Sequence, residues 1–303
     1  HVQGPPAKMA QGCCECGFCP GLCLCHKVIM SESMTVFNRQ LVARHRDRAA
    51  ATLDDHDFLF QETGERLCDR LDDVHRKFPV ALDLGCRTGT LGRTLAGRGG
   101  IEELIVCDLS QPMTERAGPR GVVADEEYLP FAPKAFDLIL SNLSLHWVND
   151  LPGALTQIRR CLKPGGLFLA TMLGGDTLSE LRQSLAKAEA AIDGGLSPRI
   201  SPFADVKDAG NLLARAGFTI PVADQEAITV SYPDPFKLMA DLRGMGEGNA
   251  VMEARKGLTS RTMMMEAARY YSEDFATDDE RIPATFQVIT LSAWAEDKNN
   301  DSV

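Results

Sequence analysis

The 303-residue sequence lacks the features that mark a membrane-spanning, exported or nucleic-acid-binding protein. No apolar run reaches the roughly 18 residues that a transmembrane helix needs. The first residues show neither a charged region followed by an apolar stretch nor an Arg-rich amphipathic pattern, so we predict no secretory signal and no mitochondrial transit peptide. Lys and Arg number 32 against 42 Asp and Glu, and the net charge of −10 argues against a general nucleic-acid partner.

The remaining composition is that of an ordinary soluble globular protein, with 44% hydrophobic and 24% charged residues. The length allows one large domain or two modest ones. Of the ten cysteines, four (Cys68, Cys86, Cys107 and Cys161) are scattered through apparent core elements, as free buried thiols usually are. This pattern fits a reducing compartment, so we predict a cytoplasmic location, or the mitochondrial matrix if the source is eukaryotic. The sequence gives no indication of the oligomeric state.

The other six cysteines fall within residues 13–25, and His26 follows them. They outnumber the ligands of a tetrahedral zinc site, but the C-x-x-C at 16–19 has no second pair at finger-like spacing. The chain begins with His, and Met34 opens the part that carries recognisable motifs. We therefore predict that residues 1–33 are a leader, disordered or not native, and we predict no metal site.

Residues 81–97, ALDLGCRTGTLGRTLAG, form the most informative stretch. A short apolar run ends in Asp83 and Gly85, and Gly89 opens an apolar-periodic helix. In this order α/β proteins present backbone N–H groups to a nucleotide. The dinucleotide pattern G-x-G-x-x-G is absent, because the next glycine after Gly85 comes four residues later. The pattern D-x-G-x-x-x-G resembles motif I of the class I S-adenosylmethionine (SAM)-dependent methyltransferases.

Four further landmarks follow in order and strengthen this resemblance. Asp108 ends a second strand within about 20 residues of the glycine turn, where an acidic group can take both ribose hydroxyls. Asp125 follows a third strand, at the place of an acidic adenine contact. FDLILSNLSLHWV is a fourth strand with its exit loop, and LKPGGLFLATM is a turn with a fifth strand. The resemblance implies SAM as the cofactor and assigns contacts with it to Asp83, Gly85, Cys86, Gly89, Asp108, Leu109, Asp125, Glu126, Asn142 and Leu143.

The predicted fold class is α/β, a Rossmann-like class I methyltransferase sheet that is mostly parallel and has an antiparallel last strand. Residues 79–303 are expected to form this SAM-binding domain. Residues 218–232 hold strand material, in which Ile228 and Val230 alternate with polar residues, and residues 286–294 alternate throughout. The order strand, long insertion, strand predicts the final antiparallel hairpin of this fold. Residues 234–275 between them predict a helical cap insertion.

Residues 34–78 are predicted to be an N-terminal helical lid over the cofactor cleft, with helices at 36–48 and 57–76. Asp54 or Asp55 is the expected cap of the second helix. Each arginine of the first helix is expected on a solvated face, whereas the cluster as a whole could meet an acidic partner or the cofactor carboxylate. These residues are Arg39, Arg44, Arg46 and Arg48.

His45 and Asp47 make an H-x-D, the start of a non-haem iron triad, but no third ligand stands at a telling spacing. Methyl transfer is an in-line displacement that depends on positioning, and a base is needed only if the nucleophile arrives protonated. His146 is the candidate base. Trp147 either stacks on adenine or covers the sulfonium, and the alternative for both residues is packing under the following helix. Arg87, where this fold usually has a further glycine, is expected to point to solvent or to approach the methionine carboxylate.

The exit loop SNLSLHWV lacks the N-P-P-[YF] motif of enzymes that methylate amides and nucleobases. Its absence argues against DNA and glutamine side chains as substrates.

Beyond the cofactor motifs, the chain resembles a bacterial relative of the respiratory complex I assembly factor 5 family. It is more distantly similar to the biotin-pathway malonyl-carrier-protein O-methyltransferase. The stretches that carry this resemblance are VFNRQLVARHRDRAA, SNLSLHWVNDLPGAL, RISPFADVKDAGNLLARAGFTIPVAD, LMADLRGMGEGNA and RIPATFQVITLSAW.

The resemblance implies a protein substrate, a respiratory complex I subunit, and a reaction that the assembly factor performs as arginine hydroxylation. Three hypotheses stay open. The chain is a SAM-dependent methyltransferase, including one that esterifies a malonyl-carrier-protein or small-molecule carboxylate. Alternatively, it is a protein modifier of the assembly-factor type, or a non-catalytic SAM-binding module.

Overall fold

The computed structural model describes residues 35–203, 205–255, 257 and 259–296. The predicted leader 1–33 lies outside the described residues. The helices are α1 (Arg39–Ala49), α2 (Phe58–Asp72), α3 (Thr90–Leu95), α4 (Gln111–Ala117), α5 (Leu151–Cys161), α6 (Ser179–Asp193), α7 (Val206–Arg215), α8 (Pro235–Gly244) and α9 (Arg261–Phe275). The described residues also form the short 3-10 turns η2 (Leu53–Asp55), η3 (Arg98–Gly100) and η4 (Leu145–Trp147). The strands are β1 (Val80–Leu84), β2 (Glu103–Asp108), β3 (Gly121–Val123), β4 (Phe136–Asn142), β5 (Leu162–Leu173), β6 (Phe218–Tyr232) and β7 (Ile282–Ala295).

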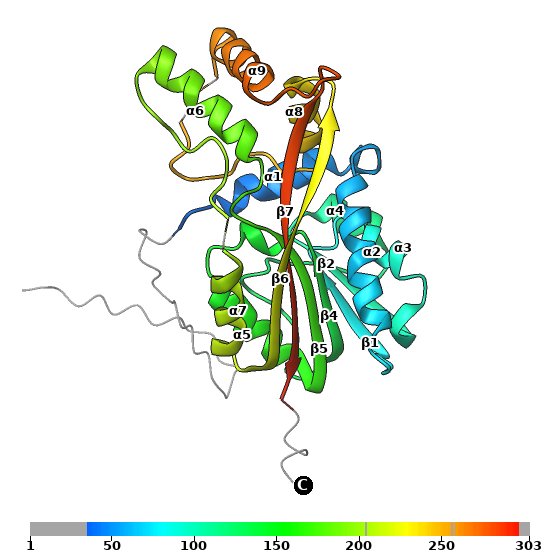
Figure 1. The fold of residues 1–303 in the computed structure, drawn as a ribbon. Coiled ribbons are helices and arrows are strands. Elements are labelled where there is room, and N and C mark those ends of the chain that lie inside the picture. The colour runs from blue at the N-terminus through cyan, green and yellow to red at the C-terminus, as the bar shows by residue number, and fades with distance from the viewer. Residues whose placement is uncertain (1–34, 204, 256, 258, 297–303) are drawn as a thin grey trace, which may run out of the picture. The chain divides into compact units, whose positions relative to one another are not determined.

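The strands of the described chain form one sheet of seven in the order β3-β2-β1-β4-β5-β7-β6 (Figure 1). The pairs from β3 to β5 are parallel, and β7 runs antiparallel to both β5 and β6. The mostly parallel sheet with an antiparallel last strand is therefore confirmed. In such a sheet the strand order reverses beside β1, and ligands bind at the carboxyl ends of the strands there.

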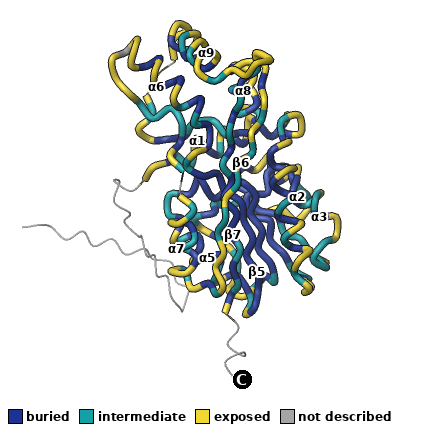
Figure 2. Tube along the Cα trace, viewed as in Figure 1, coloured by how far each residue is buried: buried dark blue, intermediate teal, exposed yellow. Residues whose placement is uncertain are grey.

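Helices cover both faces of the sheet (Figure 1). On one face α2 and α3 pack against β4, with Leu67, Leu91 and Leu138 in the contact. On the other face α5 and α7 pack through residues that include Leu155 and Leu213. Each buried side chain of this size stabilises the fold by about 1.5–3 kcal/mol. This packing, visible as the buried centre of Figure 2, holds the carboxyl ends of β1, β2 and β4 side by side.

The long strands β6 and β7 extend beyond their neighbours toward α8 and α9 (Figure 1). A second apolar cluster joins them to the cap helices through residues such as Leu181, Leu238, Met263 and Phe286. α8 and α9 lie in the expected insertion, and α6, which precedes β6, packs against α9. The cap is thus built from α6, α8 and α9.

Two local features differ from the sequence prediction. Asp57, rather than Asp54 or Asp55, takes the N-cap position of α2, because the two earlier residues are wound into η2. The K-P-G-G turn is part of β5, where it forms a bulge against β4 between the pairs Phe136–Leu162 and Leu138–Leu167. Within the described ranges, none of the helices is long and apolar enough to cross a membrane.

Candidate cofactor and substrate site

The glycine turn after β1 folds back onto the end of β2. The N–H groups of Gly85 and Cys86 both donate to the carbonyl of Cys107, at 2.7 and 3.0 Å. Gly85 and Gly89 have φ of 77° and 81°, a region that glycine adopts without steric cost. A Cβ on Gly85 would lie 2.1 Å from the Oγ of Ser144 in the loop after β4. Glycine at position 85 is therefore required both by conformation and by space.

Replacing Gly85 with alanine is expected to cost more stability than the same change at Gly97. Gly97 also has a positive φ, of 87°, but a Cβ there would meet nothing within 4 Å. The control Gly97→Ala should cost about 1–2 kcal/mol for the left-handed backbone alone. Gly85→Ala should add about 1–3 kcal/mol for the clash. Urea unfolding measures both, and equal losses would contradict the close approach of Ser144.

Asp83, in β1, is fully buried, and neither oxygen of its carboxylate has a hydrogen-bond partner among the described residues. Burial, assisted by the charge of Asp108, raises the pKa of Asp83 to about 7. A buried carboxylate without a partner is costly. An ammonium group beside Asp83 would satisfy its oxygens, and the methionine part of SAM carries such a group.

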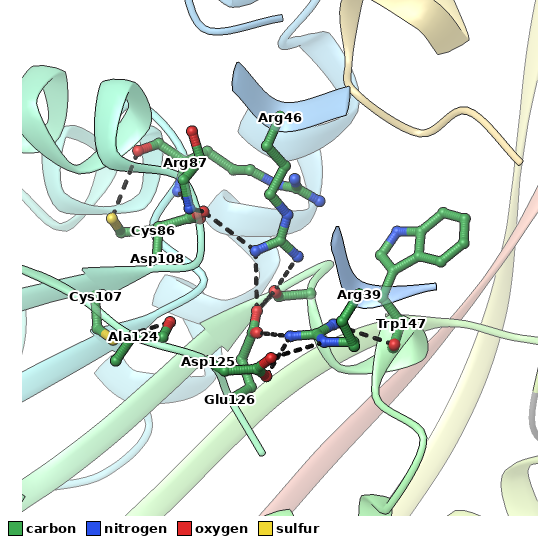
Figure 3. Close-up of polar contacts among 12 residues, drawn as sticks. Arg39, Arg46, Cys86, Arg87, Cys107, Asp108, Ala124, Asp125, Glu126 and Trp147 are labelled. Atoms are coloured by element: carbon green, nitrogen blue, oxygen red, sulfur yellow. Dashed lines mark hydrogen bonds and ion pairs between the residues drawn. The ribbon is translucent and has the colours of Figure 1, made fainter. Parts of the chain in front are cut away.

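Three carboxylates lie at the end of β2 and just after β3, and two arginines of α1 bind them (Figure 3). Arg46 Nη1 lies 3.2 Å from the Asp108 carboxylate and 3.0 Å from that of Glu126. Arg39 Nη2 lies 2.6 Å from the Asp125 carboxylate and also pairs with Glu126. The acceptors that the resemblance gives to the ribose and adenine are therefore engaged by guanidinium groups.

These ion pairs favour the charged forms of Arg46 and Glu126, although both side chains are buried. Burial lowers the pKa of Arg46, but the carboxylates of Asp108 and Glu126 outweigh it, and the pKa is raised. Burial likewise raises the pKa of Glu126, but Arg46 and Arg39 outweigh it, and the pKa is lowered. Each charge is thus compensated by a neighbour from another element.

The expectation of a solvated arginine face is wrong for half of the cluster. Arg39 and Arg46 lie seven residues apart, two helical turns, and therefore share the inner face of α1. Arg44 and Arg48, four residues apart, are exposed. Net charge and periodicity could not show which face of α1 meets the acidic strand ends.

Arg87 is also placed differently from the expectation, because its side chain is 2% exposed and does not point to solvent. Its Nη2 donates to Glu247 Oε1 at 2.5 Å and to the carbonyl of Leu143 at 3.2 Å. Burial, then the nearby Arg46, lowers the pKa of Arg87. Burial raises the pKa of Glu247, but Arg87 and His146 outweigh it and lower the pKa to about 2.

His146 and Trp147, the expected base and aromatic cover, both hydrogen-bond to Glu247. His146 Nε2 lies 3.0 Å and Trp147 Nε1 2.7 Å from Glu247 Oε2. His146 Nδ1 accepts from the N–H of Leu173, so the proton of the neutral ring sits on Nε2. Burial lowers the pKa of His146. With both nitrogens engaged, His146 acts as a base only after one of these bonds breaks. The Trp147 ring packs edge-on against Phe37.

Four other predicted cofactor contacts bind protein groups or lie buried or half-buried in the described chain. Asn142 Oδ1 accepts from the hydroxyls of Thr63 and Thr171, and its Nδ2 donates to the carbonyl of Phe60, so Asn142 ties the lid to β4 and β5. Leu143 adopts φ of 48° and offers its carbonyl to Arg87. Cys86 is buried and Leu109 half-buried beside the turn. Contact of these residues with the cofactor stays a prediction.

A cavity of about 660 Å³ lies against the loop after β4. Its apolar wall comes from the cap and the lid, and its cations are Arg48, Arg199 and Arg243. Glu247 is the single carboxylate among the described residues that line it. The apolar part of the wall includes Leu59, Phe60, Leu173, Leu178, Leu181, Met239, Met264 and Phe286. The arrangement can therefore hold a substrate group beside the cofactor end of the sheet.

Sequence reasoning missed two residues of this site, Glu247 and Ser144. Glu247 is the one acidic residue of GMGEGNA, between glycines of a methionine-rich insertion. That isolated charge was the feature of the sequence that could have pointed to it. Ser144 carries no motif, and its role follows from the approach of Gly85. In the part of the chain that the structure describes, no group of three or more His, Cys, Asp or Glu could hold a metal ion. His45 bonds the carbonyl of Gly248 instead.

Comparison with known proteins shows which family this chain belongs to. Residues 82–170 match the family model described as a methyltransferase domain. The arginine-hydroxylase NDUFAF5, mitochondrial, of Danio rerio is 44% identical over 270 residues, which cover 87% of this chain and 84% of that protein. The human protein of the same name is 44% identical, over 87% of this chain and 78% of its own length. The chain belongs to the NDUFAF5 family. Because the family model takes residues 82–170 alone, much of the likeness to NDUFAF5 lies outside the cofactor motifs.

The NDUFAF5 family is related in turn to a second group. Malonyl-[acyl-carrier protein] O-methyltransferase of Xylella fastidiosa (strain M23) is 35% identical over 86% of this chain and 89% of that protein. Among solved structures, phosphoethanolamine N-methyltransferase 2 of Haemonchus contortus in complex with SAM aligns with a TM-score of 0.52. It is 16% identical over 84% of this chain and 60% of that one. YcgJ of Bacillus subtilis aligns with a TM-score of 0.53, 14% identical over 76% and 97%. These structures share the fold. A methyltransferase domain takes SAM as its cofactor, and this chain carries that domain.

Proposed function

We propose that this chain is a SAM-binding protein modifier of the NDUFAF5 type, which acts on an arginine side chain of a respiratory complex I subunit. The observation that carries the proposal is the 44% identity to an arginine-hydroxylase over 87% of the chain. A likeness of this extent takes in far more than the cofactor turn. It supports a shared substrate type as well as a shared fold.

The site supports the same proposal. Glu247 lines the cavity next to the cofactor end of the sheet, and its carboxylate engages a guanidinium. The SAM sulfonium, when bound, supplies an electrophilic methyl group. Methylation of an arginine nitrogen adds that methyl and releases a proton. Hydroxylation instead replaces a C–H by a C–OH, and it consumes molecular oxygen and a reductant.

The reaction is tested by the mass of the arginines in complex I. We expect one arginine to carry an extra oxygen atom when this protein is present and to be unmodified when its gene is deleted. A mass gain of one methylene on that arginine would make the reaction methylation. Identical arginine masses in the two preparations would overturn the proposal.

Cofactor binding is tested separately by calorimetric titration of SAM into the full chain and an Asp108→Ala variant. The Asp108 carboxylate is the acceptor best placed for the ribose hydroxyls, at the carboxyl end of β2. We expect its loss to weaken SAM binding by about tenfold or more, since hydrogen bonds to a charged group contribute about 1.5–3 kcal/mol. Absence of SAM binding by the wild-type chain would overturn the proposal and would leave an adaptor role without the cofactor.

One observation favours a second candidate, O-methylation of a carboxylate. Arg48 and Arg243 line the cavity, and within the described residues the guanidinium group of neither has an ion pair or hydrogen bond. A carboxylate group would pair with them. Transfer of a radiolabelled methyl group from SAM to malonyl-carrier protein, as a base-labile ester, would support this candidate. Absence of this ester, together with a modified arginine in complex I, would exclude carboxylate O-methylation.

A further inference from the structure

The guanidinium of Arg87 lies in a set of groups suited to recognise an arginine side chain. Its Nη2 donates to Glu247 Oε1 at 2.5 Å and to the carbonyl of Leu143 at 3.2 Å. Its Cζ lies 5.3 Å from the centre of the Phe60 ring. A carboxylate, a carbonyl and an aromatic face are the partners that a guanidinium prefers.

This receiving site is held in place by residues other than Arg87. Glu247 Oε2 accepts from Trp147 Nε1 at 2.7 Å and from His146 Nε2 at 3.0 Å. The N–H of Leu173 in turn fixes the His146 ring. The orientation of the carboxylate therefore does not depend on Arg87, and Oε1 stays directed at whichever donor lies there.

Arg87 itself is a poorly matched occupant. Its backbone has φ of 52°, in the left-handed region that a residue with a side chain rarely adopts. Its Nε and Nη1 are buried without a hydrogen-bond partner in the described chain. A guanidinium has five donor hydrogens, and in Arg87 only those on Nη2 form hydrogen bonds in the described chain. Unmatched donors of this kind are costly.

The receiving site also opens to the cavity. Glu247, Leu143 and Phe60, the three residues that contact the guanidinium, all line the cavity, whereas Arg87 does not. Arg87 reaches them from the glycine turn between Gly85 and Gly89. Arg48, Arg199 and Arg243 also line the cavity, so a cationic side chain is held there only if Glu247 compensates its charge.

We propose that Glu247 receives the guanidinium of the substrate arginine, and that Arg87 occupies this place until the substrate enters from the cavity. The inference rests on the proposed function, because it assigns the site of the arginine that is modified. Glu247 is then the specificity-determining residue. Displacement of Arg87 links the substrate to the glycine turn, where the cofactor binds.

The test measures binding of N-acetyl-arginine methylamide to the full chain, followed by the fluorescence of Trp147 in a Trp294→Phe background. The citrulline analogue, neutral and of the same shape, is the matched ligand. We expect the citrulline analogue to bind about tenfold or more weakly, because hydrogen bonds between charged partners are the stronger ones. Equal affinity of the two ligands would overturn the proposal. This comparison needs no substitution in the receiving site itself.

Variants separate a receiving site from a structural ion pair. Arg87→Met should bind the arginine analogue about tenfold more tightly than the parent, because the competing guanidinium is gone. Arg87→Met/Glu247→Gln, which leaves no unpaired charge and should fold if Arg87→Met does not, should lose the preference for arginine over citrulline. Unchanged affinity in Arg87→Met, or a preference kept by the double variant, would contradict the assignment.

These measurements need neither SAM nor turnover, so they fail independently of the proposed function. A Glu247-dependent preference for arginine without any modified arginine in complex I would overturn the function and keep the receiving site. A modified arginine without such a preference would overturn the receiving site and keep the function.

Discussion

Replacing Asp83 with asparagine is expected to stabilise the cofactor-free protein at pH 8 by on the order of 2–4 kcal/mol and to change little at pH 4. The carboxyl group of Asp83 is fully buried without a hydrogen-bond partner in the described chain, and burial raises its pKa to about 7 from 3.8. A carboxyl group whose pKa is higher in the folded state than in the unfolded state favours folding when the pH lies below its unfolded-state pKa. That contribution is lost as the pH rises through about 7. The amide of asparagine does not ionise, so it stays neutral at every pH of the test.

Urea unfolding at pH 4, 6 and 8 measures this effect, with Asp278→Asn on the surface as the control. Asp278 is exposed, so its replacement should leave the pH dependence unchanged. The same Asp83→Asn variant should bind SAM about tenfold or more weakly, because the ammonium of the cofactor loses its carboxylate. A variant that is stabilised and still binds SAM normally would show that Asp83 is not the ammonium acceptor.

Much of the fold could be predicted because local signals agree with one another. The apolar run before Gly85 and the alternation in β6 and β7 gave the strands, and the acidic strand ends gave the side of the sheet on which the cofactor binds. The final antiparallel strand was predicted from the long insertion that precedes it. The capping residue of α2 and the position of the K-P-G-G segment were placed wrongly, because η2 and the bulge in β5 depend on packing between elements.

The partners of charged side chains could not be predicted from the sequence. Arg46 is separated from Asp108 by 62 residues and Arg87 from Glu247 by 160. Neither distance leaves a local pattern, since periodicity reports which residues share a face but not what that face meets. The sequence thus predicted acidic groups for the cofactor site. It could not show that arginines of α1 bind them.

Arg46 is expected to have opposite effects on stability and on cofactor binding. Removing its guanidinium leaves Asp108 and Glu126 buried without this partner, so Arg46→Ala should cost the cofactor-free protein about 3–5 kcal/mol. Arg44→Ala is the matched control. Arg44 belongs to the same helix but is exposed, and its guanidinium group has no ion pair or hydrogen bond in the described chain. Thermal unfolding of both variants tests the first effect.

Cofactor binding should change in the other direction. If Asp108 takes the ribose hydroxyls as predicted, SAM has to displace Arg46 from this carboxylate. A protein whose competent state is sparsely populated binds with an affinity reduced by that fraction. Freeing the acceptors should therefore tighten SAM binding in Arg46→Ala by about tenfold or more, and SAM should raise the melting temperature of this variant more than that of the wild type. Weaker binding by Arg46→Ala, with Arg44→Ala unaffected, would instead show that Arg46 stays in the cleft and contacts the cofactor. In that case α1 would be part of the binding site, whereas tighter binding would make α1 the element that has to move.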